Sequence, residues 1–114
     1  MNPLYRIILY AKDVILLTEY YRTVLGLRHV FMSDDKNWSE FETGGCRLAL
    51  HNGGVKGGKA KMPKIVFYVR NVEKEKEKLI KKGADMGKIF IFGDIKFCNG
   101  TDPEGNIFQI SNRK

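Results

Sequence analysis

The sequence predicts an α+β fold built from two βαβββ modules, and three observations support this prediction. Residues 6–14, RIILYAKDV, align with residues 64–72, KIVFYVRNV, at a constant offset of 58. Residues 47–52, RLALHN, align with residues 107–112, IFQISN, at an offset of 60, where a duplication would repeat the last strand. The stretch TDPEGNIFQISN, at 101–112, reads as a tight turn followed by a strand. Each module is therefore expected to open and close with a strand.

The first module continues from its opening strand into a helix predicted over 14–25. Asp13 precedes this helix as a favoured N-cap residue, and Gly26 follows it as a favoured stop. Its apolar residues at near-helical spacing are Ile15, Leu16, Tyr20 and Leu25. Three strands are then expected near residues 28–33, 38–43 and 46–52.

The second module repeats this order around a shorter and more polar helix predicted over 72–82. Asn71 is its expected cap and Gly83 its expected stop. The residues expected to face inward are Val72, Leu79 and Ile80. Strands are expected near residues 87–92, 94–99 and 106–112, the last after a turn in which Pro103 and Gly105 suit the second and fourth positions.

The chain length and composition predict a single domain. The protein has 114 residues, of which 43% are hydrophobic, enough for an ordinary globular core. Within this domain, module 1 is expected over about 4–52, a Gly- and Lys-rich linker over about 53–62, and module 2 over about 63–112. No apolar run is long enough to span a membrane and no signal-peptide pattern is seen, so a cytoplasmic location is expected. Cys46 and Cys98 have no CxxC spacing and are expected to be unpaired core residues.

The net charge of +7 raises the alternative of a basic nucleic-acid or protein-interaction module. The positive residues are spread along the chain, however. The densest run, EKEKEKLIKKG at 73–83, mixes both signs and is typical of the solvated face of a helix. The Gly-rich stretch at 52–61 lacks the spacing of a phosphate-binding loop. Nucleic acid is therefore the less favoured partner.

The paired modules, the stretch YYRTVLGL at 20–27 and the ending DPEGNIFQI at 102–110 resemble the vicinal oxygen chelate superfamily. This group includes glyoxalase I, extradiol dioxygenases, and the bleomycin- and fosfomycin-resistance proteins. The resemblance implies that the two modules form a cupped mixed sheet around a cavity, with the modules pairing within one chain or swapping between two. A homodimer is the expected assembly.

The resemblance also implies four positions for metal ligands, and this sequence does not match them. The first-strand positions fall on Arg6 and Lys64, and the last-strand positions on Ala49 and Gln109. Charged arginine and lysine have no free lone pair, and alanine has no donor atom. Gln109 alone offers an oxygen. We therefore expect no bound divalent metal, no cofactor, and none of the metal-dependent chemistry of the family.

Strand alternation assigns side chains to two faces, one apolar and directed at the helices, the other mixed and directed at the cavity. The expected ligand-binding residues are Arg6, Tyr10, Trp38, Arg47, Ala49, His51, Lys64, Tyr68 and Gln109. Structural alternatives stand beside these roles, because tyrosines suit strands, Trp38 suits a core, and long cations extend into solvent at strand ends. His51 is the candidate general base, whereas His29 is expected at the surface.

These observations favour a metal-independent protein that binds a small molecule in the cupped cavity. An anionic molecule is favoured, with its charged group between Arg6 and Lys64. The alternative is a metal-independent or atypical enzyme of the same superfamily, a lyase, an isomerase or a dioxygenase-like protein, using His51 or the tyrosines. The sequence does not decide between binding and catalysis.

Overall fold

A computed structural model of the chain describes residues 5–53 and 63–114. The chain divides into two compact units, residues 1–58 and 59–114, each of which is described by itself. The predicted linker, apart from Gly53, lies outside the described residues. Among the helices that the structure describes, none is long and apolar enough to cross a membrane.

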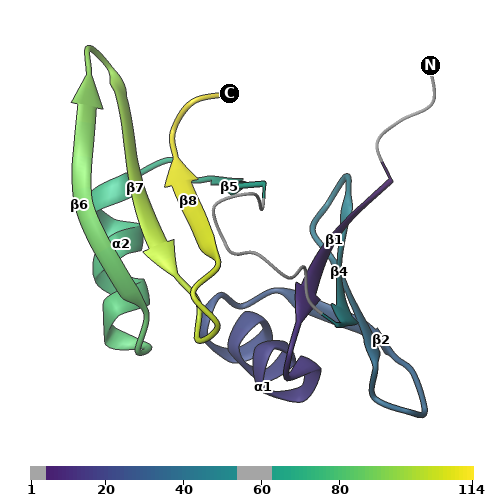
Figure 1. The fold of residues 1–114 in the computed structure, drawn as a ribbon. Helices are drawn as coiled ribbons and strands as arrows, with labels where there is room; N and C mark the ends of the chain where they lie inside the picture. Colours follow the sequence, from purple (N-terminus) through teal and green to yellow (C-terminus); the bar gives the residue numbers. More distant parts are fainter. Residues whose placement is uncertain (1–4, 54–62) are drawn as a thin grey trace. The chain divides into compact units, whose positions relative to one another are not determined.

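The first unit contains one four-stranded sheet, called sheet A, and one helical segment. Its elements are β1 (Arg6–Ala11), α1 (Val14–Glu19), the π-helical turn η1 (Tyr20–Val24), β2 (Arg28–Met32), β3 (Trp38–Glu42) and β4 (Arg47–Asn52). The strand order is β1-β4-β3-β2. Strands β1 and β4 run parallel, and the other neighbours run antiparallel (Figure 1).

The second unit repeats this arrangement around sheet B. Its elements are β5 (Ile65–Tyr68), α2 (Val72–Lys81), β6 (Asp85–Phe92), β7 (Ile95–Thr101) and β8 (Ile107–Ser111). The order β5-β8-β7-β6 places the parallel pair first, as in sheet A. The predicted element order βαβββ is therefore confirmed in both units. Lys64 differs from the expectation, because it precedes β5 instead of belonging to it.

The strand registers confirm the two offsets of the sequence repeat. Ile7 lies opposite Leu48 in sheet A, and Ile65 lies opposite Phe108 in sheet B. These positions are related by 58 residues in the first strand and by 60 in the last. Because a slip of one residue would exchange the faces of a strand, the same alternation has fixed the same register twice.

Both helices begin at the predicted residues, whereas α1 gives way to η1, which ends at Val24, and α2 ends at Lys81, each one residue before the predicted end. The Asp13 side chain accepts a hydrogen bond from the Leu16 amide at 3.0 Å, and the Asn71 side chain accepts one from the Lys74 amide at 3.0 Å. Gly26 and Gly83 follow the helices with φ of 72° and 99°, a conformation that glycine adopts without steric cost.

The apolar residues noted at near-helical spacing in the first helix do not form its buried face. Ile15 and Leu16 are 54% and 48% exposed. The buried residues are Val14, Leu17, Thr18 and Tyr21. This spacing of three, four and seven residues starts at the first helical position, so the buried stripe is set by the cap. In α2, Val72 and Leu79 are buried as expected, but Ile80 is 49% exposed.

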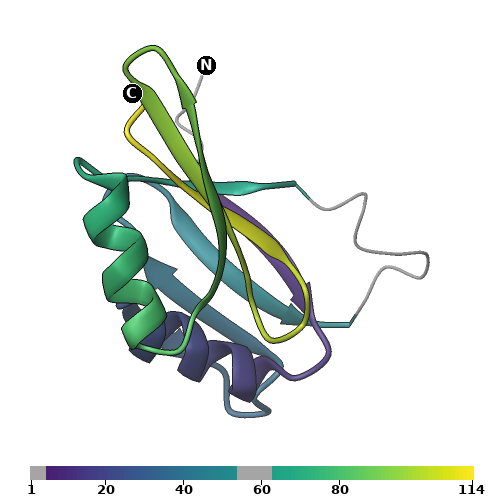
Figure 2. The same ribbon diagram turned by 90° about the vertical axis from the view of Figure 1, so that its left-hand side faces the viewer.

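Each helix covers one face of its own sheet and leaves the other face without a helix. α1 packs on β3 and β4, and α2 packs on β6, β7 and β8 (Figures 1 and 2). The helix-facing residues are buried, among them Leu9, Ala11, Leu48, Leu50, Ile65, Phe108 and Ile110. On the opposite faces, Tyr10 and Tyr68 are 42% and 48% exposed. The predicted sorting of the two faces is confirmed.

His29 lies on the covered face of sheet A, and its predicted surface position was wrong. It is half-buried, its Nε2 lies 2.9 Å from the Ser39 hydroxyl, and its ring packs against Phe41.

Candidate functional site

The open face of sheet A, the face that α1 does not cover, gathers six of the nine predicted ligand-binding residues. The strand register arranges its side chains in three rows: Arg6, Arg47 and Glu42; Ile8, Ala49 and Glu40; Tyr10, His51 and Trp38. Strands β1, β4 and β3 therefore supply one residue each to every row. Ala49 is fully buried in the middle row, beneath its neighbours.

Glu40 lies at the centre of this face and connects the other polar groups. Its Oε1 accepts hydrogen bonds from Arg6 Nη2 and Arg47 Nη1, each at 3.2 Å. Its Oε2 accepts one from the indole Nε1 of Trp38 at 2.7 Å. The Glu40 side chain is only 9% exposed, so one buried carboxylate holds two cations and an indole in place.

The ionisation of this cluster follows from these contacts. Burial raises the pKa of Glu40, but hydrogen bonds from Trp38, Arg47 and Arg6 outweigh it and hold the pKa below its usual range. The hydrogen bond to Glu40 raises the pKa of Arg47. The cluster is therefore fully charged at neutral pH.

Aromatic rings flank the two guanidinium groups. The Arg6 guanidinium lies 5.1 Å from the Tyr5 ring centroid and 5.9 Å from that of Trp38, and the Arg47 guanidinium lies 5.8 Å from Tyr5. At these distances the rings attract the cations. Because each guanidinium has five N–H donors, Glu40 does not use all of them.

His51 stands between two aromatic rings with a defined tautomer. Its ring lies 5.5 Å from Tyr10 and 5.4 Å from Trp38. Its Nδ1 is 2.6 Å from the carbonyl oxygen of Asn52, which can only accept, so Nδ1 carries the proton. The neutral ring therefore has its lone pair on Nε2.

The other three predicted residues belong to the second unit. Gln109 donates from Nε2 to Asn99 Oδ1 at 2.9 Å on the open face of sheet B. Tyr68 is on the same face, and the Lys114 ammonium lies 5.2 Å from its ring centroid. Lys64 is exposed ahead of β5. Its predicted pairing with Arg6 around an anion stays a prediction.

Sequence reasoning missed Glu40, although its signal was present. Trp38, Glu40 and Glu42 alternate with Ser39 and Phe41, which are buried against the helix side. This period of two places the carboxylates on the open face. What the sequence did not supply was the strand order that puts β3 beside β4 and brings Glu40 to both arginines.

The residues at the four positions where the resemblance implies metal ligands do not fit a divalent cation. Arg6 and Lys64 are positively charged and Ala49 has no donor atom, so the side-chain oxygen of Gln109 is the single candidate ligand among these four positions. Glu40 is the carboxylate nearest to these positions in sheet A, and both of its oxygens already accept hydrogen bonds. No group of three or more His, Cys, Asp or Glu residues placed to hold a metal occurs within residues 5–53 and 63–114.

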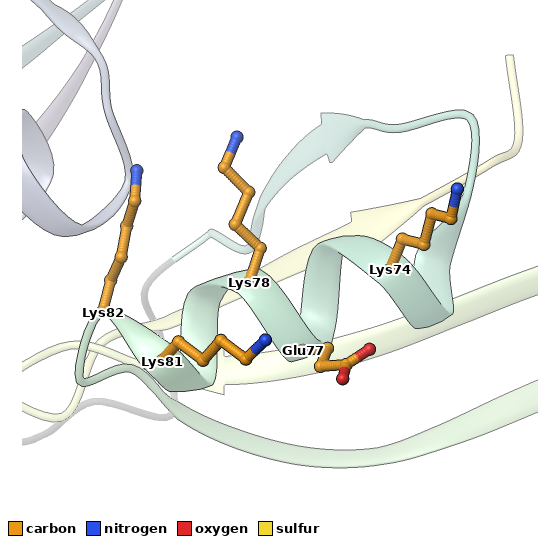
Figure 3. A pocket seen from close by; sticks show the side chains of 5 residues that line it. All are labelled: Lys74, Glu77, Lys78, Lys81 and Lys82. Atoms are coloured by element: carbon orange, nitrogen blue, oxygen red, sulfur yellow. The ribbon is translucent and has the colours of Figure 1, made fainter.

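A second charged feature lies on the outer surface of α2. A shallow hollow there is lined by Lys74, Glu77, Lys78, Lys81 and Lys82, and Figure 3 shows Lys74, Lys78 and Lys82 projecting from one side of the helix. The positive charge is less evenly spread than expected, because residues 59–114 contain 13 Lys and Arg against seven Asp and Glu, which is +6 of the total +7. Lysines near the end of a helix also favourably oppose its dipole, which accounts for Lys78, Lys81 and Lys82.

Comparison with known proteins gives matches among solved structures only. No protein-family model matches the sequence, and no curated protein matches it. A lactoylglutathione lyase from Agrobacterium tumefaciens superposes with a TM-score of 0.80 at 18% identity, over 97% of this chain and 93% of that chain.

Two further structures agree with this one over most of both chains. The fosfomycin resistance protein FosX from Mesorhizobium loti matches with a TM-score of 0.78 at 17% identity, over 100% of this chain and 94% of that chain. A glyoxalase/bleomycin resistance protein/dioxygenase family enzyme from Burkholderia phytofirmans PsJN matches with a TM-score of 0.78 at 18% identity, over 96% and 98%. At these identities the likeness establishes the fold alone.

Proposed function

We propose that this chain, which has the fold of the vicinal oxygen chelate superfamily, binds a small molecule on the open face of sheet A without a divalent metal. The observation that carries the proposal is the cluster in which Glu40 joins Arg6, Arg47 and Trp38. The face is lined by aromatic and aliphatic side chains around a few fixed polar groups, which is the usual make-up of a small-ligand site. We also propose that the ligand is held in the cupped cavity that the resemblance implies.

Metal independence follows from the charge of the cluster. A divalent cation about 6 Å from each guanidinium would be repelled by about 5 kcal/mol per arginine, at an effective dielectric constant of about 20. One carboxylate, Glu40, cannot offset two such terms while it is also bonded to both arginines. The Lewis-acid chemistry of metal-dependent relatives therefore has no support from these residues.

Protein purified without chelators is expected to contain no stoichiometric divalent metal. The measurement is elemental analysis by inductively coupled plasma mass spectrometry, before and after incubation with zinc, nickel, manganese and iron followed by desalting. One metal per chain that disappears on Gln109→Ala or Glu40→Gln would contradict the proposal.

The arginines support an anionic ligand. Glu40 Oε1 is shared by Arg6 and Arg47, so these three residues together carry a charge of +1 and retain unused N–H donors. Glu42 is a weaker neighbour, with Oε2 3.5 Å from Arg47 Nε. A carboxylate or phosphate matches the planar fork of a guanidinium, and Tyr10, Trp38 and Ile8 would contact an aromatic or aliphatic body.

Arg6→Met is expected to weaken binding of an anionic ligand by about 1.5–3 kcal/mol, because one hydrogen-bonded charge is lost. The ligand would first be identified by a thermal-shift screen of metabolites and antibiotics, since a molecule that binds only the native state raises the melting temperature. The affinity would then be measured by isothermal titration calorimetry.

The control for this measurement is Arg22→Met. Arg22 is exposed on η1, where its partner is Glu19, so its replacement should leave affinity unchanged. Lys64→Met tests separately whether the second unit contributes a cation. Equal affinities of wild type and Arg6→Met for the ligand would show that Arg6 does not contribute to binding.

An enzyme remains the second candidate, and the geometry of His51 favours it. With Nδ1 donating to the Asn52 carbonyl, Nε2 is the ring nitrogen that can accept a proton, and it lies beside Tyr10 and Trp38 on the open face. A base so placed could remove a proton from a bound ligand without any metal. The two candidates are separated by following a bound ligand over time for chemical turnover.

A further inference from the structure

The open face of sheet B, the face that α2 does not cover, carries a stack of three phenylalanine rings. Phe90 and Phe92 lie on β6, and Phe97, which alternates with buried Cys98, lies on β7 opposite Phe90. The centroid of the Phe97 ring lies 5.3 Å from that of Phe90 and 6.0 Å from that of Phe92, with interplanar angles of 19° and 9°. Phe90 and Phe92 are 38% and 66% exposed. Nearly parallel and exposed ring planes favour another flat ring as the group that covers them.

A second aromatic surface lies on the same face. One row of the register runs from Tyr68 on β5 through Ser111 on β8 and Phe97 on β7 to Phe90 on β6. Ser111 is small and 4% exposed, so it separates Tyr68 from the phenylalanine stack. Neighbouring strands are about 4.8 Å apart, which places the backbones of Tyr68 and Phe97 about 10 Å apart. This separation is larger than one aromatic ring, so a ligand that covers both surfaces must contain at least two rings.

Each aromatic surface has a lysine beside it. The Lys88 ammonium lies 5.1 Å from the ring centroid of Phe90, and the Lys114 ammonium lies 5.2 Å from that of Tyr68. Arg113 follows β8 at the end of the sheet where Tyr68 lies. Within residues 5–53 and 63–114, none of these three cations forms an ion pair with Asp or Glu. Their charge is therefore available to an anionic ligand.

We infer that the open face of sheet B binds a single strand of nucleic acid, with one base stacked on Tyr68 and another on Phe92, the most exposed ring of the stack. Proteins bind single strands by combining aromatic platforms for the bases with cations for the backbone phosphates. Sheet B contains that combination twice: Tyr68 with Lys114, and the phenylalanine stack with Lys88. Because a strand repeats one base and one phosphate per nucleotide, it matches both combinations together.

An amide pair adds hydrogen-bonding groups to this face. Asn99 and Gln109 lie opposite each other on β7 and β8, two residues along each strand from Phe97 and Ser111. Gln109 Nε2 donates to Asn99 Oδ1 at 2.9 Å, which leaves Gln109 Oε1 as an acceptor and Asn99 Nδ2 as a donor. The edges of unpaired bases carry both kinds of group, so the pair suits a base better than it suits an apolar ring.

The rings distinguish a single strand from other anionic partners. A duplex presents phosphates but keeps its bases stacked inside, and an acidic peptide presents carboxylates without regularly repeated rings. A free nucleotide has one base and cannot cover both surfaces. The sequence alone made nucleic acid the less favoured partner, because the cations are spread along the chain. The unit that carries these rings, however, also carries +6 of the net charge of +7.

The test is fluorescence anisotropy with labelled dodecathymidylate and with oligouridylate of the same length. Wild type is expected to bind at least one of the two strands, and to bind a duplex of that length about tenfold more weakly or less. Phe92→Ala should raise the dissociation constant for the strand about fivefold to a hundredfold, because one stacked base is lost. Phe92→Leu should weaken binding similarly, because leucine is apolar but has no ring, whereas Phe92→Trp should retain it.

The matched control is Phe31→Ala. Phe31 is 49% exposed on β2 of the first unit, so its replacement should leave the affinity for the strand unchanged. Lys88→Ala should lower the affinity and reduce the slope of log K against log salt concentration by about 0.7, the value for one phosphate of a single strand. Because the Phe92 side chain is largely exposed, its replacement should not unfold the sheet, and circular dichroism verifies this.

Three results would overturn the inference: neither strand binds, the duplex binds as tightly as the strand, or Phe92→Ala binds as wild type does. A mononucleotide that competes as well as the strand would also overturn it, because one base would then be enough. These results are independent of the small-molecule site proposed on sheet A, because Phe92 and Lys88 belong to the other unit.

Discussion

Asp102→Ala is expected to lower the free energy of unfolding by about 3–5 kcal/mol, because three hydrogen bonds to a buried carboxylate are lost. Asp102 is 4% exposed in the turn before β8. Its Oδ1 accepts from the Glu104 and Asn106 amides, and its Oδ2 accepts from Asn106 Nδ2, each at 2.9 Å. Gly105 completes the turn with φ of 82°. Alanine would leave buried N–H groups of Asn106 without their acceptor.

The measurement is urea unfolding, followed by far-ultraviolet circular dichroism and by the fluorescence of Trp38. The single tryptophan lies in the first unit and Asp102 lies in the second. The fluorescence therefore reports on the unit that does not carry the substitution. Asp102→Asn keeps one carbonyl oxygen and should cost less than Asp102→Ala. Asp34→Ala, an exposed aspartate in the turn between β2 and β3, should change stability little. A loss below about 1 kcal/mol for Asp102→Ala would contradict the structural role of this carboxylate.

The duplication and the element order were predictable because they rest on local patterns that repeat. The turn that contains Gly105, the caps Asp13 and Asn71, and the alternation of each strand all constrain neighbours in sequence. Alternation predicts that Ile7 and Leu48, and likewise Ile65 and Phe108, share one face, and the structure adds that they lie opposite each other. Local consistency was therefore enough to establish the element order and the two faces.

Packing inside each unit was not predictable from the repeat. Phe41 lies opposite Leu48 in sheet A, and the matching pair in sheet B is Gly100 opposite Phe108. A Cβ atom at Gly100 would lie 2.4 Å from the Phe108 ring, so the large residue has moved from one strand to its neighbour. Such a difference involves residues on strands that are distant in sequence, and alignment of the halves does not reveal it.

The site was predicted as a set of residues but not as a charged cluster. Arg6 and Arg47 were placed on the open face by alternation, yet their partner is Glu40, from a strand whose faces the sequence analysis had not sorted. A contact between β1 and β3 depends on β4 lying between them, which is a property of the whole sheet. Arg6 is therefore less free to bind an anion than the sequence suggested.

Glu40→Gln is expected to lower the free energy of unfolding at pH 7 by about 2–3 kcal/mol. The loss should fall below the roughly 3–5 kcal/mol typical of a broken buried pair, because water reaches the two guanidinium groups. Their side chains are 33% and 31% exposed, against 9% for Glu40. Glu42→Gln is the control on the same strand: its side chain is 35% exposed, and its contact to Arg47 should contribute about 1 kcal/mol or less.

The pH dependence of stability identifies the charge as the cause. The pKa of Glu40 in the folded protein is below its ordinary value of 4.5. The stabilisation is therefore fully present above that ordinary value and is lost as pH falls through the folded-state pKa. On acidification the free energy of unfolding should fall more steeply for wild type than for Glu40→Gln. The two values should therefore converge at low pH. If the difference in free energy of unfolding between wild type and Glu40→Gln is the same at all pH values, the loss comes from packing and not from charge.

The same substitution should affect ligand affinity in the opposite direction. If the proposed anionic ligand binds here, Glu40 of the wild type would compete with it for the N–H donors of Arg6 and Arg47. Glutamine keeps the side-chain volume and an oxygen acceptor for Trp38 but removes the negative charge, so the anion would meet two cations without a competing carboxylate. Calorimetric titration should therefore show tighter binding to a less stable protein, by about 1 kcal/mol or more for a charge-assisted hydrogen bond. Weaker binding, parallel to the loss of stability, would mean that Glu40 positions the arginines for the ligand and does not compete with it.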